Sequence, residues 1–287
     1  MQFPASELVL DAEGRVYHLG LYPNQLAKTV IVVGDQDRVK QVSHFFDEIN
    51  HQSQHREFVC HTGKFRGKEI SVLSTGIGTD NIDICLNELD ALVNIDLEKR
   101  EEKQAKIALK IVRIGTCGIL QPEIPIHSYI LSKGAFGLDN IAHFYAIDFN
   151  DEERKNAIKF TKDLGLPDSI VPYFIHSSES LNDKLSSDQT FEGYTVTSSG
   201  FYGPQGRELR LKKVIPEMNE RLTAMEFEKD RIVNFEMESS ALFAMSRGLG
   251  HECTTICLGV ANRPKMEFSK GYSEEMDKLI LYVLERI

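Results

Sequence analysis

The chain has 287 residues, of which 41% are hydrophobic and 26% are charged, so it can bury a substantial core and is not of the disordered class. Its net charge of -10 argues against nucleic acid or an anionic membrane as the main partner, because such surfaces bind clustered Lys and Arg. The five cysteines are scattered without a CxxC pair, which favours reduced thiols over a disulfide framework or a metal site.

The N-terminal segment carries Glu7, Asp11 and Glu13, whereas a signal peptide needs a basic start followed by an apolar core. No uncharged run in the sequence approaches the length needed to span a membrane. We therefore expect a cytoplasmic protein without a membrane partner.

Short apolar runs alternate with helical patterns along the chain, which is typical of an α/β sheet covered by helices. We expect strands at residues 29–33, 70–73, 111–114, 128–131, 194–197 and 256–260. Ligands in α/β folds gather where such strands end in turns. We expect glycine-bearing turns at Gly34, at Gly76 and Gly78, and at Gly115 and Gly118.

Residues 96–106 mix charge signs and include almost no apolar side chains. They separate a predicted helix over residues 82–92 from the strand at 111–114, and their composition is typical of a solvated helix extension or loop. The strand patterns on both sides lead into similar glycine segments. We therefore predict a charged insertion within one continuous sheet, and a single domain over residues 1–287.

Residues 34–38 (GDQDR) directly follow the first predicted strand and open a helix. Backbone N–H groups and the Arg38 guanidinium would converge there, where an anion could bind. Such turns also carry Gly and Asp for steric and capping reasons. The segment by itself leaves both interpretations open.

Arg113 ends an otherwise apolar strand, where an unpaired guanidinium would be costly, so it requires an anionic partner. Its rigid donor fork suits phosphate, and the Thr116 hydroxyl with the amides of the predicted glycine turn could complete the oxygen shell. The alternative is an internal ion pair with a buried Asp or Glu.

Residues 198–207 place Phe201 and Tyr202 just before the sequence Gln205-Gly206-Arg207. An aromatic face can stack on a planar heterocycle, while the Gln amide and the Arg fork can hydrogen-bond its carbonyl and imide edge. The alternative is a surface loop anchored by its aromatic side chains.

Glu236 and Glu238 flank Met237 where a predicted strand passes into a helix that contains residues 241–245. Buried carboxylates are costly unless they are partnered. A carboxylate at this junction can accept two hydrogen bonds from vicinal hydroxyls, which a ribose presents. The alternative is an acidic first helical turn favoured by the helix dipole.

In this order, the segments resemble the nucleoside phosphorylase family, and within it the uridine phosphorylase branch. The resemblance covers nearly the whole chain and rests on residues 17–21, 34–38, 55–58, 74–78, 113–116, 201–207 and 234–239. It implies an α/β fold with three layers, α/β/α, around a central mixed and partly barrel-like β-sheet. No Ser-His-Asp pattern or HExxH motif supports an ordinary hydrolase instead.

The resemblance also assigns site residues, in four groups. Phosphate would bind Gly34, Arg38, Arg113 and Thr116, with Arg56 from a neighbouring subunit. Ribose would bind Met237 and Glu238, with His18 from the neighbouring subunit at the 5′-hydroxyl; of the two acids, Glu238 is assigned in preference to Glu236. The base would bind Phe201, Gln205 and Arg207. The catalytic residues among these would be Arg113, Gln205, Arg207 and Glu238.

Because each site takes two residues from a neighbour, the resemblance implies at least a homodimer, and a hexamer as the larger assembly. It implies inorganic phosphate as co-substrate, no required cofactor, and a monovalent cation such as K⁺ at the subunit interface near Glu57 and Ser74. Purine-specific relatives carry an aspartate where residues 259–263 here are GVANR. Its absence favours a pyrimidine base.

The implied reaction is reversible phosphorolysis of uridine to uracil and ribose 1-phosphate in pyrimidine salvage, with deoxyuridine and thymidine as further substrates. The alternatives are a purine nucleoside or methylthioadenosine phosphorylase, a nucleosidase that uses water, and a nucleoside-binding protein without catalysis.

Overall fold

The computed structural model describes residues 2–228 and 230–287, and within them strands and helices alternate as expected. The main sheet contains β1 (Thr29–Val33), β2 (Glu48–His55), β3 (Phe58–Phe65), β4 (Lys68–Ser74), β7 (Lys110–Ile119), β8 (Tyr129–Gly137), β9 (Tyr173–His176), β10 (Thr190–Thr197), β11 (Glu226–Phe227), β12 (Asp230–Glu236), β13 (Glu252–Asn262) and β14 (Glu267–Phe268). The helices are α1 (Gln36–Ser43), α2 (Thr79–Asn94), α3 (Asp151–Leu164), α4 (Glu179–Leu185), α5 (Met218–Ala224), α6 (Ser239–Leu249) and α7 (Ser273–Leu284).

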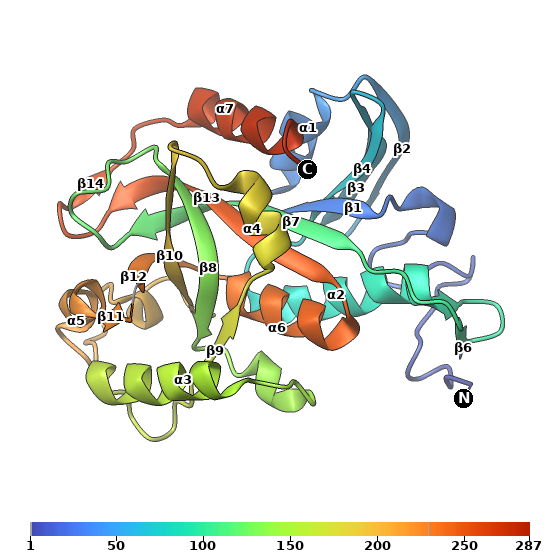
Figure 1. Cartoon of the computed structure of the whole chain (residues 1–287). Coiled ribbons are helices and arrows are strands. Elements are labelled where there is room, and N and C mark those ends of the chain that lie inside the picture. The colour runs from blue at the N-terminus through green and yellow to red at the C-terminus, as the bar shows by residue number, and fades with distance from the viewer. Residues whose placement is uncertain (1, 229) are drawn as a thin grey trace.

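The sheet closes on itself at β7. This strand pairs in parallel with β1 and β13, and it also pairs antiparallel with β12 at Gly118 and Ile119. Strands β12, β10, β8, β13 and β7 therefore form a closed ring, while β1, β4, β3 and β2 continue from β7 as an open sheet. The expected mixed, partly barrel-like sheet is confirmed (Figure 1).

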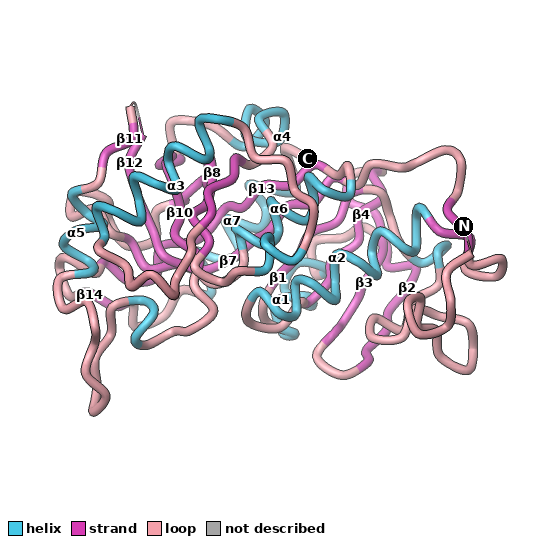
Figure 2. The backbone as a smooth tube through the Cα atoms, turned by 90° about the horizontal axis from the view of Figure 1, so that it is seen from below, coloured by secondary structure: helices cyan, strands magenta, loops and turns pink. Residues whose placement is uncertain are grey.

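Helices cover both faces of this sheet. On one side α2 and α6 pack together and α6 lies against β8 and β13; on the other side α1 packs on β3 and β4 and contacts α7 (Figure 1). Seen from below, β11 and β12 lie at one end of the molecule and β2 and β3 toward the other (Figure 2). No helix in the described ranges is both long and apolar enough to cross a membrane.

All six predicted strands are present, but the turn predicted at Gly115 and Gly118 is wrong. Strand β7 continues through both glycines to Ile119. At Gly115 the reason is steric, because a Cβ there would lie 1.9 Å from Nη1 of Arg113, whereas one at Gly118 would meet the Arg263 side chain at an ordinary contact distance of 3.6 Å. Gly115 thus makes room for the Arg113 side chain within a continuous strand.

The charged insertion is a short hairpin and not a helix extension. Helix α2 ends at Asn94, whose side-chain oxygen accepts from the backbone N–H of Ile107 at 2.7 Å. Between them β5 (Ile95–Asp96) and β6 (Glu101–Glu102) pair antiparallel. The Arg100 side chain donates to the carbonyl of Phe3 at 2.9 Å, so the hairpin holds the N-terminal segment beside it (Figure 1).

Candidate active site

A cavity of about 710 Å³ lies where the ends of β1, β4, β7 and β12 meet the starts of α1, α2 and α6. Residues from the segment after β10 and from the end of β13 complete its wall. The predicted site residues that line it are Gly34, Arg38, Arg113, Thr116, Phe201, Gln205, Arg207, Met237 and Glu238. Segments far apart in the sequence are thus brought to one place.

An ion pair between Arg113 and Glu238 forms the floor of this cavity. Nη2 of Arg113 donates to Oε2 of Glu238, and Nη1 lies 3.5 Å from Oε2 of Glu236. The other Glu238 oxygen accepts from the backbone N–H of Gly78, at the start of α2, at 2.7 Å. The internal partner that the sequence left open for Arg113 is therefore present, and it is the residue proposed for ribose.

Glu236 and Glu238 share the Arg113 guanidinium, and this sharing shifts the pKa values of Glu238 and Arg113. Burial raises the pKa of Glu238, and the nearby charge of Glu236 raises it further, against the opposing effects of Arg113 and the Gly78 N–H. Burial acts to lower the pKa of Arg113, but Glu238 and Glu236 together raise it above its ordinary value. Arg113 therefore stays charged, while Glu238 is held at a cost.

Glu236 has a different environment from Glu238. Its carboxylate accepts from the backbone N–H groups of Glu238 and Ser239 at 2.9 to 3.1 Å, and from the Thr197 hydroxyl. These bonds satisfy the free N–H groups at the start of α6. Both acids line the cavity, but the carboxylate of Glu236 is already occupied by the start of α6, which favours Glu238 as the acid that can bind a ligand.

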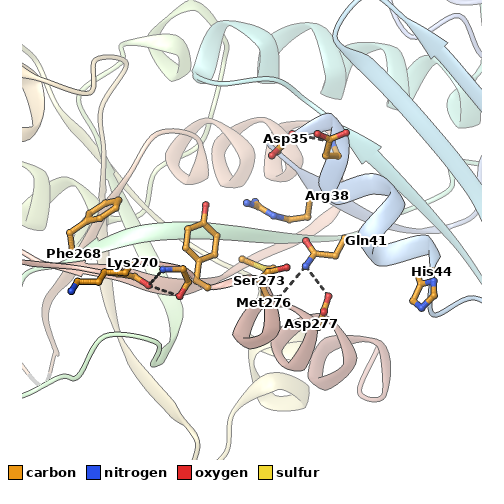
Figure 3. Close-up of a pocket in the computed structure, with 13 residues that line it drawn as sticks. Asp35, Arg38, Gln41, His44, Phe268, Lys270, Ser273, Met276 and Asp277 are labelled. Carbon is orange, nitrogen blue, oxygen red and sulfur yellow. Dashed lines mark hydrogen bonds between the residues drawn. The ribbon is translucent and has the colours of Figure 1, made fainter.

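Arg38 lies between this cavity and a second one of about 750 Å³, which is bounded by α1, α7 and residues 268–273 (Figure 3). Its guanidinium has no hydrogen-bond or ion-pair partner among residues 2–228 and 230–287. Burial lowers the pKa of Arg38, and repulsion from Arg113 lowers it further. Two guanidiniums that repel each other across a cavity create a place for an anion.

The base-binding residues predicted from the sequence contact one another. Nη1 of Arg207 donates to Oε1 of Gln205 and to the carbonyl of Phe201, each at 2.6 Å. The Arg207 guanidinium carbon lies 3.7 Å from the centre of the Phe201 ring. Gln205 is buried and its amide nitrogen lies 3.4 Å from the carbonyl of Glu236. The pair is thus anchored to the floor of the cavity.

Arg263 is a neighbour that the sequence analysis missed. Burial lowers the pKa of Arg207 to about 10, and the charge of Arg263 adds to this effect. Nη1 of Arg263 is buried and has no hydrogen-bond partner among the described residues. The sequence signal was an arginine directly after strand β13, at the end of residues 259–263, where the sequence analysis considered only the absence of an aspartate.

His18 and Arg56 do not line the cavity of their own chain. They lie together around Tyr17: Nη2 of Arg56 is 3.5 Å from the Tyr17 hydroxyl, and the rings of Tyr17 and His18 make an edge contact at 5.0 Å. Nδ1 of His55 lies 2.8 Å from the His18 carbonyl oxygen. The two residues that were assigned to a neighbouring subunit are thus gathered in one cluster outside the site.

Comparison with known proteins places this site in a family. The profile of the phosphorylase superfamily matches residues 28–285, which is nearly the whole chain. The chain belongs to the phosphorylase superfamily. The family match spans every element that lines the cavity, from β1 to β14.

Its relatives include two curated uridine phosphorylases. That of Thermococcus kodakarensis is 29% identical over 274 residues, covering 96% of this chain and 87% of the relative. That of Escherichia coli is 27% identical and covers 88% of both chains. A DeoD-type purine nucleoside phosphorylase from a Thermoanaerobacter species is 28% identical but covers 54% of this chain and 62% of the relative. The likeness to the uridine phosphorylases extends over more of the chain.

The fold is shared with solved structures. A Trypanosoma brucei nucleoside phosphorylase described as showing uridine phosphorylase activity superposes with a TM-score of 0.88 at 28% identity, covering 98% of this chain and all of the other. A uridine phosphorylase of Phytophthora capsici superposes with a TM-score of 0.73 at 23% identity. The expected nucleoside phosphorylase fold is therefore confirmed.

Proposed function

We propose that this chain is a uridine phosphorylase, a pentosyltransferase that converts uridine and inorganic phosphate reversibly into uracil and ribose 1-phosphate. The observation that supports this most is one cavity that Arg38, Arg113, the acid Glu238 and the Gln205–Arg207 pair line together. The arginines suit an anion, the acid suits vicinal hydroxyls, and the Gln205–Arg207 pair suits a carbonyl and imide edge.

Phosphate would bind between Arg38 and Arg113, with the Thr116 hydroxyl and the backbone around Gly34 beside it. An anion there removes the repulsion between the two guanidiniums and lies beneath the anomeric carbon. It supplies the nucleophile and also the countercharge for the cationic character that develops on the ribose. Positioning and preorganised charge then lower the barrier, and no covalent enzyme intermediate is required.

The leaving base requires stabilisation at the other end. Negative charge collects on the uracil oxygens as the glycosidic bond stretches. Arg207 and Gln205 donate hydrogen bonds to that edge, and the second cation, Arg263, adds a positive potential that the sequence did not reveal. A poor leaving group can thus depart without a strong general acid.

The test is uracil release from uridine by the purified protein with and without phosphate, in parallel with thymidine, deoxyuridine, inosine and methylthioadenosine. We expect phosphate-dependent release with uridine preferred. Purine release would favour the purine or methylthioadenosine alternative, and release without phosphate would indicate a nucleosidase. Binding of uridine without turnover would indicate a non-catalytic protein.

We further propose that the active unit is at least a homodimer, in which His18 and Arg56 complete the site of the partner subunit. Their placement in a half-exposed cluster outside their own cavity supports this. A hexamer of three dimers is the larger assembly we propose. A monovalent cation would bind at the interface near Glu57, which lines the cavity, and Ser74.

Complementation tests this sharing. An Arg113→Ala chain and an Arg56→Ala chain should each be inactive alone. After mixing, denaturing and refolding together, a hybrid dimer has one intact site, and roughly a quarter of the wild-type activity should return. No recovery would mean that Arg56 acts within its own chain.

A further inference from the structure

Glu88, in the middle of α2, is the residue whose contacts the proposed reaction does not yet explain. Its side chain is only 14% exposed, and both oxygens are directed at one short segment. Oε1 accepts from the His18 backbone N–H at 2.9 Å and Oε2 from the Leu19 N–H at 2.8 Å. Oε1 also lies 2.6 Å from Nδ1 of the His18 ring. One carboxylate thus holds both the backbone and the side chain of His18.

The ring contact fixes the tautomer of His18. A carboxylate only accepts hydrogen bonds, so the nitrogen that faces it carries the proton. In the neutral ring the other nitrogen, Nε2, is then an acceptor. Nε2 has no hydrogen-bond partner among the described residues, and the side chain is 32% exposed, so this nitrogen is available to a ligand. The imidazole is therefore held at one end and free at the other.

Other contacts stop the ring from turning away. The edge contact with Tyr17 holds one side of the ring, and Nδ1 of His55 lies 2.8 Å from the His18 carbonyl. Leu19, the next residue, is 1% exposed and anchors the segment in the core. If Glu88 only had to hold this segment, the two backbone N–H contacts would suffice. The additional ring contact indicates a role for the orientation of the imidazole.

We propose that Glu88 is the positioning residue for His18, and that it presents Nε2 as the acceptor for the 5′-hydroxyl of a nucleoside bound by the partner subunit. This rests on the proposed function. Helix α2 then serves two sites, since its first turn begins at Gly78, which binds Glu238 of its own cavity, and Glu88 orients a side chain for the other. Carboxylates that orient histidines in this way act through the histidine and do not touch the substrate.

The experiment compares uridine with 5′-deoxyuridine, which lacks only the hydroxyl in question. For Glu88→Gln we expect kcat/KM for uridine to fall about tenfold, because the amide no longer fixes the tautomer, and kcat/KM for 5′-deoxyuridine to stay within about twofold of wild type. His18→Ala should show the same selective loss. The double variant should lose no more than either single one, because both remove one interaction.

Asp90→Asn is the matched control. Asp90 lies two residues further along α2 and its Oδ1 is 3.3 Å from Nε2 of His251, a buried histidine away from the site. Like Glu88→Gln, this variant neutralises an acid of α2 that lies beside a histidine. The ratio of the two kcat/KM values should stay at the wild-type level in this variant, whatever its stability.

Three outcomes would overturn the proposal. They are a wild type that does not distinguish the two nucleosides, an equal loss for both in Glu88→Gln, and wild-type kcat/KM for both in that variant. Failure of the proposed function would differ, because the wild type would release no uracil with phosphate. If Glu88→Gln does not fold, ¹⁵N NMR of the wild-type imidazole decides: a proton on Nδ1 is expected, and a neutral ring with its proton on Nε2 would overturn the proposal.

Discussion

Two arginine–glutamate pairs with buried carboxylates lie at opposite ends of α6, and they differ in what surrounds them. At the start of the helix Glu238 pairs with Arg113 on the floor of a 710 Å³ cavity. At its end Arg247 donates to both oxygens of Glu153 at 2.7 and 2.8 Å, and Glu153 also accepts from the backbone N–H groups of Asn150 and His176.

The pKa values of the two acids are displaced in opposite directions. Burial acts to raise the pKa of Glu153, but Arg247 and the two backbone N–H groups outweigh it and lower the pKa. For Glu238 burial prevails and the pKa is raised. Glu153 has a hydrogen-bond donor for each of its lone pairs, and we expect its ion pair to stabilise the fold. Glu238 shares Arg113 with Glu236 and opens on a cavity, so we infer that its ion pair can exchange partners with ligands.

Removing the cation of the first pair should have the largest effect. In Arg113→Ala we expect kcat/KM for uridine to fall by about 10³-fold, since phosphate and the developing ribose cation lose a preorganised group. Arg247→Ala is the control, and it should retain wild-type kcat/KM per folded molecule. Steady-state kinetics over a phosphate series would measure both, and equal losses in the two variants would remove the distinction.

Displacing the same cation without deleting it should have a smaller effect. In Gly115→Ala the new methyl group would collide with Nη1 of Arg113 at 1.9 Å and with Sγ of Cys257 at 2.9 Å. We expect about a 100-fold loss in kcat/KM, because a guanidinium shifted by roughly 1 Å no longer fits phosphate. Gly271→Ala meets nothing within 4 Å and should be neutral. Wild-type phosphate affinity in Gly115→Ala would contradict this placement of Arg113.

The second pair should matter for stability instead. Glu153→Gln should lower the free energy of unfolding by about 2 kcal/mol at pH 7, at the low end for a buried pair because the Arg247 side chain is 36% exposed. Urea unfolding followed by circular dichroism measures it. Activity per folded molecule should be unchanged, and a loss of turnover in the folded fraction would place this pair in the catalytic machinery.

The acid of the first pair should behave in the reverse way. Glu238→Gln removes a carboxylate that the fold holds at a cost, so the free energy of unfolding should stay level or rise. Meanwhile kcat/KM for uridine should fall about tenfold, because ribose hydroxyls lose a charged acceptor. Kinetics below saturating uridine and urea unfolding together test this. Lower stability with unchanged kinetics would exchange the roles of the two acids.

The smallest effect is the pH dependence of stability. The lowered pKa of Glu153 stabilises the fold above its unfolded pKa of about 4.3, and this contribution is lost as pH falls through the lowered folded value. The raised pKa of Glu238 has the opposite sign, since the folded state takes up its proton first and gains stability as pH falls toward about 4.3.

Unfolding free energies of the wild type and both Gln variants between pH 7 and about pH 3 would measure this. A tenfold difference in proton affinity between the folded and unfolded states corresponds to roughly 1.4 kcal/mol of stability. Both gaps should close toward acid, but from opposite sides: the wild type should lose its advantage over Glu153→Gln and gain stability relative to Glu238→Gln. Parallel curves would mean that the fold perturbs neither acid.

The sequence predicted elements where burial leaves a pattern. Strands β1, β4 and β13 are apolar runs and were predicted, but β2 is the polar sequence EINHQSQH with mostly exposed side chains, so no hydrophobic alternation marked it. Gly115 was predicted as a turn residue because the close approach of the Arg113 side chain leaves no local signature.

For the candidate site, the residue types were recognisable but their partners were not. Arg113 and Glu238 are separated by 125 positions, so only the fold could decide that they pair. The same holds for the saturation of Glu236 by the first turn of α6 and for the approach of Arg263 to Arg207. Local chemistry indicates what a side chain can bind, and tertiary structure selects which of those partners it meets.

The ion pair on the cavity floor makes the two substrates depend on each other. Without either substrate, the cation proposed for phosphate, Arg113, and the anion proposed for ribose, Glu238, neutralise one another. A phosphate that engages Arg113 releases Glu238, and a nucleoside that engages Glu238 releases Arg113. By reciprocity each raises the affinity for the other by the same factor. The phosphate concentration therefore sets how tightly the protein holds its nucleoside.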